Sequence, residues 1–182
     1  MKYFYLPIII FCFAACRSDN KLSSSNIIPE KNAAAKQPVR NSSTRTWIYS
    51  EETDQKIPGK KYSADIVANE LLQFDFPEDG GSTVTLSIDK TSTITRALLN
   101  ISKGQFSAGI EGSIVNIGFD NAQPLAFKAS SVTNGGEAII SIDDVKSLIQ
   151  SLKFAKKMTI RADFYDSGSR EMTFDVAGFK WE

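Results

Sequence analysis

Alternation of apolar and polar side chains, which runs from Thr44 to the end of this 182-residue chain, constrains the fold more than any other feature. Period-two segments separated by turn residues are typical of β-strands that bury one face, because successive side chains point to opposite faces. The alternating apolar positions are Tyr62, Ala64, Ile66 and Ala68; Leu72, Phe74 and Phe76; Val84, Leu86 and Ile88; Val115, Ile117 and Phe119; and Leu125, Phe127 and Ala129. Further strands are predicted to begin at Trp47 and to span 94–101, 106–110 and 138–142.

A single helix is predicted late in the chain, over about residues 143–154. Its apolar residues stand at i, i+3, i+4 and i+7, namely Val145, Leu148, Ile149 and Leu152. This spacing places them in one stripe, and Ser141 or Asp143 is a plausible N-cap. The fold class that follows is mostly β, a single antiparallel β-sandwich or flattened barrel with one late α-helix packed on it.

The last two strands can be assigned a register from their pattern. The apolar sets are Met158, Ile160, Ala162 and Phe164 on one strand and Met172, Phe174 and Val176 on the other. A three-residue loop, Ser167-Gly168-Ser169, keeps both sets on one face, whereas a one-residue slip would turn one set to solvent. The predicted pairs are Phe164 with Met172, Ile160 with Val176, and Arg161 with Asp175.

The first 15 residues read as a signal peptide. Lys2 precedes an apolar run from Tyr3 to Phe13, and Ala14 and Ala15 follow. The run is shorter than the roughly 20 residues of a transmembrane helix, and Pro7 interrupts it. A basic start, an apolar centre and small residues before the cut are typical of export signals.

Phe13-Ala14-Ala15-Cys16 resembles the cleavage motif of bacterial lipoproteins, with Phe13 where that family usually has Leu. The resemblance implies that Cys16 becomes the first residue after cleavage and carries the lipid, whose acyl chains hold the protein on the membrane. It implies a lipid-anchored protein of the bacterial cell membrane. In such lipoproteins an Asp after the lipidated cysteine favours inner-membrane retention. Arg17 stands at that position here, which favours the outer membrane. The alternatives are an ordinary secretory signal cut nearby, or a buried cysteine in an apolar segment.

Residues 17–44 have too few apolar side chains to form a core and are predicted to be a tether. As a flexible coil, such a segment has a mean reach of about 30 Å. The expected organisation is a signal peptide at 1–15, a lipidated cysteine and flexible tether at 16–44, and a β-sandwich domain at 45–182. One alternative is that Asn26-Ile27-Ile28 docks as an extra edge strand.

Missing residue types exclude several kinds of chemistry. The chain has no histidine, and its two cysteines are Cys12 and Cys16. The domain therefore has no His or Cys to bind zinc, no cysteine nucleophile and no Ser-His-Asp triad. Removal of residues 1–15 leaves 20 basic and 21 acidic side chains, so charge gives no reason to expect nucleic acid. We expect no cofactor and no metal.

Acidic clusters are the remaining candidates for catalysis or cation binding. Asp143-Asp144 is explained by its place at a helix start. Glu51, Glu52 and Asp54 could form an oxygen-ligand cation site, although a solvated loop is the simpler interpretation. Glu78-Asp79 lacks the ligand spacing of a calcium loop.

Aromatic side chains at strand ends form the candidate binding surface. They are Trp47, Tyr49, Tyr62, Tyr165 and Trp181. Exposed aromatics could anchor a partner or stack on sugars. The alternative for each is core packing or sealing of the core's rim.

The domain also resembles small exported β-sandwich proteins of the VasI and invasion-associated-locus-B type. The residues that suggest it are Trp47, Ser50, Asp54, Gly59-Lys60, Ala64, the Leu148–Leu152 segment, Phe174 and Gly178-Phe179. The resemblance implies a protein that is not an enzyme, and no functional residue is carried over from it.

The function predicted from the sequence is a lipid-anchored, non-enzymatic binding module of the bacterial cell envelope. Its expected partners are the membrane, through the lipid on Cys16, and a protein of the envelope or the extracellular space. Three alternatives stay open. They are an envelope inhibitor or immunity protein that occludes another protein, a carboxylate-only glycoside hydrolase, and a carrier of a small apolar ligand.

Overall fold

A computed structural model describes residues 46–53, 59–75, 80–108, 112–133 and 136–182. All of them lie in one compact unit, Asn41–Glu182. The strands are β1 (Ile48–Thr53), β2 (Lys60–Val67), β3 (Val84–Lys90), β4 (Thr95–Ile101), β5 (Ser113–Phe119), β6 (Leu125–Val132), β7 (Gly136–Ile142), β8 (Lys157–Phe164) and β9 (Gly168–Asp175), and the helix between β7 and β8 is α1 (Val145–Leu152).

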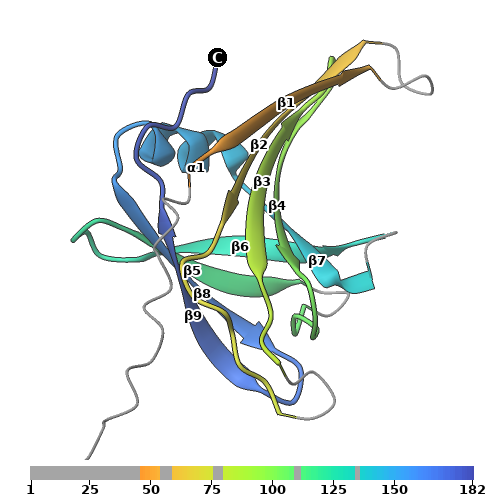
Figure 1. Cartoon of the computed structure of the whole chain (residues 1–182), viewed down its shortest axis with the longest axis vertical. Helices are drawn as coiled ribbons and strands as arrows, with labels where there is room; N and C mark the ends of the chain where they lie inside the picture. Colours follow the sequence, from red (N-terminus) through yellow and green to blue (C-terminus); the bar gives the residue numbers. More distant parts are fainter. Residues whose placement is uncertain (1–45, 54–58, 76–79, 109–111, 134–135) are drawn as a thin grey trace, which may run out of the picture. The chain divides into compact units, whose positions relative to one another are not determined.

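The nine strands form one antiparallel sheet in the order β1-β2-β3-β4-β7-β6-β5-β8-β9. In Figure 1, β1–β4 curve along one side of this unit, and β5–β9 run across it. The strands β1 and β9 stand at the two ends of the pairing order, so the sheet does not close into a barrel. The prediction of a mostly-β, antiparallel fold with one late helix is confirmed. The sheet is open and not a closed barrel.

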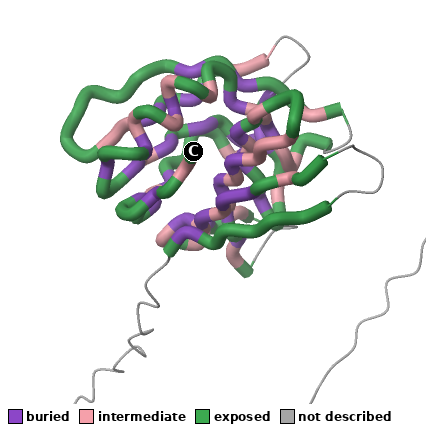
Figure 2. Tube along the Cα trace, turned by 90° about the horizontal axis from the view of Figure 1, so that it is seen from above, coloured by how far each residue is buried: buried purple, intermediate pink, exposed green. Residues whose placement is uncertain are grey.

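The core lies on one face of this bent sheet. Alternate residues of the strands are buried, for example Val84, Leu86 and Ile88 on β3. Figure 2 shows the buried residues gathered in the interior, with exposed positions towards the outside. Every buried apolar side chain among the described residues falls between Trp47 and Phe179. The compact unit therefore contains a core of its own.

Two predicted strands are not strands. Leu72 makes only an isolated bridge with Ser82, and Phe106 only one with Phe164. The Leu72 N–H and C=O exchange both hydrogen bonds with Ser82, at 2.9 and 2.8 Å, which closes a loop instead of extending a ladder. Both apolar residues are nonetheless buried. Phe76 and residues 109–110 lie outside the described residues.

The predicted register of the last hairpin was right about the faces and wrong about the partners. Phe164 pairs with Gly168 instead of Met172, and Ile160 pairs with Met172. Arg161 lies opposite Glu171 instead of Asp175. The loop is Tyr165–Ser167, closed by the Ser167 N–H donating to the Phe164 carbonyl at 3.2 Å. Gly168 has a φ of +65°, which glycine adopts without strain, so the ladder resumes at once.

The predicted helix begins and ends close to its expected limits, but its cap is a different residue. Asp144, and not Ser141 or Asp143, is the N-cap, and its carboxylate accepts the Ser147 N–H at 3.4 Å. Asp144 has a φ of +51°, a left-handed conformation that Asp tolerates better than most residues. Leu148 and Leu152 of α1 are fully buried. No helix within the described ranges is both long and apolar enough to cross a bilayer.

Candidate functional site

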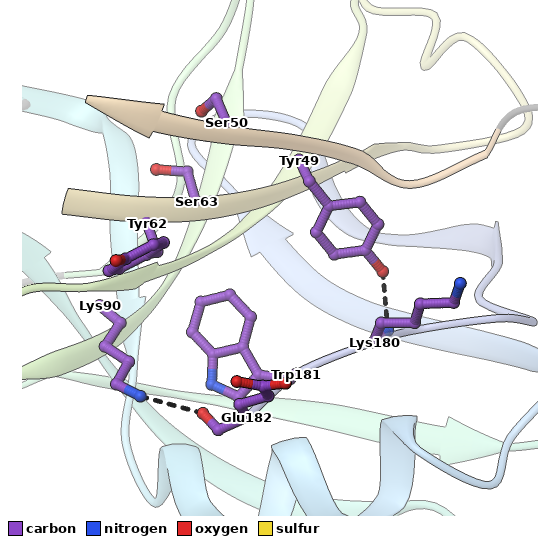
Figure 3. A pocket seen from close by; sticks show the side chains of 8 residues that line it. All are labelled: Tyr49, Ser50, Tyr62, Ser63, Lys90, Lys180, Trp181 and Glu182. Carbon is purple, nitrogen blue, oxygen red and sulfur yellow. Dashed lines mark hydrogen bonds between the residues drawn. The ribbon is translucent and has the colours of Figure 1, made fainter. Parts of the chain in front are cut away.

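An open groove, with a volume of about 440 Å³, lies between β1–β3 and residues 180–182. Three of the five aromatic residues singled out from the sequence meet in it, namely Tyr49, Tyr62 and Trp181. The groove is completed by Lys90, Lys180 and Glu182 (Figure 3). We call these six residues the aromatic groove.

Strand register explains why residues distant in the sequence meet here. Tyr49 pairs with Ala64, which pairs with Ile88, and both of those partners are fully buried. Directly paired residues share a face, so Tyr49 stands on the core face of the sheet. Tyr62 and Lys90 pair with each other one row farther along the same face. The strand residues of the aromatic groove therefore lie on the same face of the sheet as the core, where that face becomes exposed to solvent.

Ser50 and Ser63 border the groove, but their side chains point away from it (Figure 3). They pair with each other and lie on the opposite face of the sheet. There the Ser63 hydroxyl donates to Asp89 at 2.7 Å, and Lys61 forms an ion pair with Asp89 at 3.0 Å. These groups stabilise the outer face and are not part of the contact surface.

The wall formed by residues 180–182 is held from behind by aromatic packing. Phe179 packs on Trp47 with ring centroids 4.5 Å apart. It also stacks on Trp181 at 6.0 Å, with an angle of 10° between the rings. Because buried Phe179 supports the indole of Trp181, that indole is held in place before any ligand arrives.

Two hydrogen bonds tie the same segment to the sheet. The backbone N–H of Lys180 donates to the Tyr49 hydroxyl at 2.7 Å. The Lys90 ammonium donates to the main-chain oxygen of Glu182 at 3.0 Å. Figure 3 shows both bonds spanning from the strands to the segment. They fix the width of the groove.

Several polar groups in the groove are left for a ligand. Among the described residues, the Tyr62 hydroxyl and the Trp181 indole N–H have no hydrogen-bond partner, and the Lys180 ammonium and Glu182 carboxylate make no ion pair. Tyr49 and Tyr62 are 45% and 42% exposed. Exposed aromatic surface beside a few polar groups without a partner makes the aromatic groove the candidate binding site.

An ion pair flanks the groove on the same face. Lys60 lies 2.5 Å from Glu51. The hydrogen bond that the Lys60 ammonium donates to this carboxylate, and then the negative charge of the carboxylate, raise the pKa of Lys60 above its ordinary value. Both side chains are exposed to solvent and do not line the groove, so the pair contributes little to stability and leaves the groove open.

The other two predicted aromatics do not join the groove. Trp47 is only 8% exposed, and its indole N–H donates to the Val176 carbonyl at 3.0 Å. It belongs to the core, which is the alternative that the sequence left open for it. Tyr165 is 62% exposed, in the turn between β8 and β9, and does not line the groove.

The acidic candidates have structural explanations where they are described. Asp144 caps α1, and Glu51 pairs with Lys60. No group of three or more His, Cys, Asp or Glu side chains suited to a metal is found in the described part of the chain. Asp54, Glu78 and Asp79 lie outside the described residues, as does Cys16.

Sequence reasoning missed the three charged members of the groove. Lys90 enters it by pairing with Tyr62, and this could have been found only from the register of β2 and β3. Lys180 and Glu182 flank Trp181 in the sequence, which is a local signal that was available.

Comparison of the chain with protein-family models, curated proteins and solved structures found no match.

Proposed function

We propose that this protein is a lipid-anchored, non-enzymatic binding module of the bacterial cell envelope, and that the aromatic groove is its contact surface. The single observation that carries the binding role is the convergence of Tyr49, Tyr62 and Trp181 in one open groove. Three aromatic side chains from separate parts of the chain would bury substantial apolar area against a partner.

The place of action rests on the amino-terminal sequence. Lipid on Cys16 would hold the protein at the membrane, on the outer-membrane side of the envelope if Arg17 acts as expected. Residues 17–44, as a flexible tether of about 30 Å mean reach, would let the domain search the space around its anchor. The partner expected there is a molecule of the envelope or of the extracellular space.

Affinity capture from detergent-solubilised envelopes tests the proposal with the full-length lipidated protein. The affinity tag belongs within residues 17–44, because Trp181 and Glu182 line the groove and a tag beyond them would obstruct it. A partner retained by the unchanged protein should be lost from Tyr62→Ala and Trp181→Ala. The matched control is Tyr165→Ala, which removes an exposed aromatic residue outside the groove.

Three outcomes are informative. Loss of the partner from the two groove variants, and its retention by the control, supports the groove as the contact surface. Equal retention by all variants would mean that the partner contacts a surface other than the aromatic groove. Capture of no partner by the unchanged protein counts against a binding module.

A further inference from the structure

We propose that the aromatic groove binds a neutral, hydroxyl-rich glycan, with a flat sugar ring stacked against Trp181 and Tyr62. This inference rests on the proposed binding function and names the ligand class of the same site. Its carrying observation is the pairing of exposed aromatic surface with polar groups of both signs in one open groove.

Aromatic surface provides the first part of the argument. The indole of Trp181 stacks on Phe179 on one side, at 6.0 Å and 10°. Its remaining surface faces the groove, where Tyr62 and Tyr49 also project (Figure 3). Such surfaces suit the C–H faces of a sugar ring, which are apolar, flat and rigid. Because the indole is already fixed, little side-chain entropy is lost on binding.

Charge provides the second part. The groove presents the Lys90 ammonium, which gives one of its N–H groups to the Glu182 main-chain oxygen, together with the carboxylate of Glu182, while the Lys180 side chain runs away from Trp181 (Figure 3). An anionic ligand would satisfy the lysine and be repelled by the glutamate, and a cationic ligand would do the reverse. A hydroxyl group both donates and accepts hydrogen bonds. A neutral polyol can therefore hydrogen-bond to groups of both signs and brings no charge of its own that either would repel.

The packing behind Trp181 argues against a peptide as the ligand. Peptide recognition commonly depends on a large side chain inserted into a desolvated pocket. Here the space behind the groove is already occupied by Trp47 and Phe179, which are 8% and 7% exposed. The volume of about 440 Å³ falls in the range of small-ligand sites, about 300–1,000 Å³. The groove therefore suits a ligand that lies across it.

Intrinsic fluorescence gives a direct binding assay. The chain has two tryptophans, and Trp47 is buried while Trp181 lines the groove. Residues 41–182, which contain every buried apolar side chain among the described residues, are titrated with chitotetraose and with cellotetraose, two neutral glycans of flat, β-linked sugars. The expected result is a saturable change in emission that disappears in Trp181→Phe.

Variants separate stacking from hydrogen bonding. Tyr62→Ala should weaken binding about five- to hundredfold, because the lost ring contact and the lost hydrogen bond each account for about two- to tenfold. Tyr62→Phe keeps the ring and should weaken binding about three- to tenfold by removing one hydrogen bond. Tyr165→Ala should bind as the unchanged protein does. Calorimetric titration measures the variants that lack the fluorescence signal, and urea midpoints confirm that each variant is folded.

Competing ligands decide the chemical class. Preference for a sulfated oligosaccharide or for a proline-rich peptide over the neutral glycans would overturn the inference, as would no binding of either tetrasaccharide. If the glycans fail but the groove variants still lose a captured envelope protein, the inference fails and the proposed function stands. If capture is also absent, both fail.

Discussion

Trp47 offers the most stringent test of how the two ends of the domain are held together. Its ring is 8% exposed and packs on Phe179 at 4.5 Å, while its N–H donates to the Val176 carbonyl at 3.0 Å. Trp47→Ala removes the ring, the hydrogen bond and the packing together, and should destabilise the domain by about 3–5 kcal/mol. That is a large share of a typical total of about 5–15 kcal/mol.

A second variant divides this loss into its parts. Trp47→Phe retains an aromatic ring against Phe179 but leaves the Val176 carbonyl without its donor. An unpaired buried acceptor costs about 1–3 kcal/mol, so this variant should lie between the unchanged protein and Trp47→Ala.

Urea denaturation of residues 41–182, followed by far-ultraviolet circular dichroism, measures both variants without depending on the removed fluorophore. The midpoint should fall while the slope with denaturant stays constant, because a similar surface is exposed on unfolding. A loss below about 1 kcal/mol for Trp47→Ala would refute the assignment of Trp47 to the core, since core truncations cost more.

Three further predictions concern other parts of the chain. Asp144→Ala should lower the urea-derived stability by about 1–2 kcal/mol, because it removes the N-cap carboxylate that accepts the Ser147 N–H and places alanine at a left-handed position. An unchanged urea midpoint would contradict the role of Asp144 as the cap. The pKa of Lys60 is raised by Glu51 above the ordinary 10.5, so the contribution of their pair to stability is constant from about pH 6 to 9 and is lost as pH rises through the folded value. Lys60→Met should therefore alter the pH dependence of stability only in that alkaline range. A stability difference between the variant and the unchanged protein that changes from pH 6 to pH 9 would contradict this. Cys16→Ser should move the protein from the detergent to the aqueous phase in a Triton X-114 partition, and retention in the detergent phase would argue against a lipid on Cys16.

The sequence predicted the faces of the strands better than their partners. Burial requires a period of two, so β3, β5 and the apolar sets of β8 and β9 could be read directly from spacing. Pairing depends on turn geometry, and the left-handed φ of Gly168 moved the register of β9 by four residues. Leu72 has the spacing of a strand, but its hydrogen bonds close a loop with Ser82.

The candidate site could be predicted only in part for a related reason. Residue type marked Tyr49, Tyr62 and Trp181 as candidates, and the fold brings them together. The same reasoning could not separate them from Trp47, because exposure depends on what packs behind each ring. Lys90 reached the site through cross-strand pairing with Tyr62, which becomes visible only once the register is known.

Photo-crosslinking in intact cells tests most directly whether the aromatic groove is the contact surface of a lipid-anchored module. The photoreactive residue p-benzoylphenylalanine is placed at Tyr62 in the groove, and at Tyr165 as the exposed control outside it. The account predicts a light-dependent adduct from position 62, isolated with the membrane fraction, and none from position 165. No adduct from position 62, or equal adducts from both positions, would contradict it.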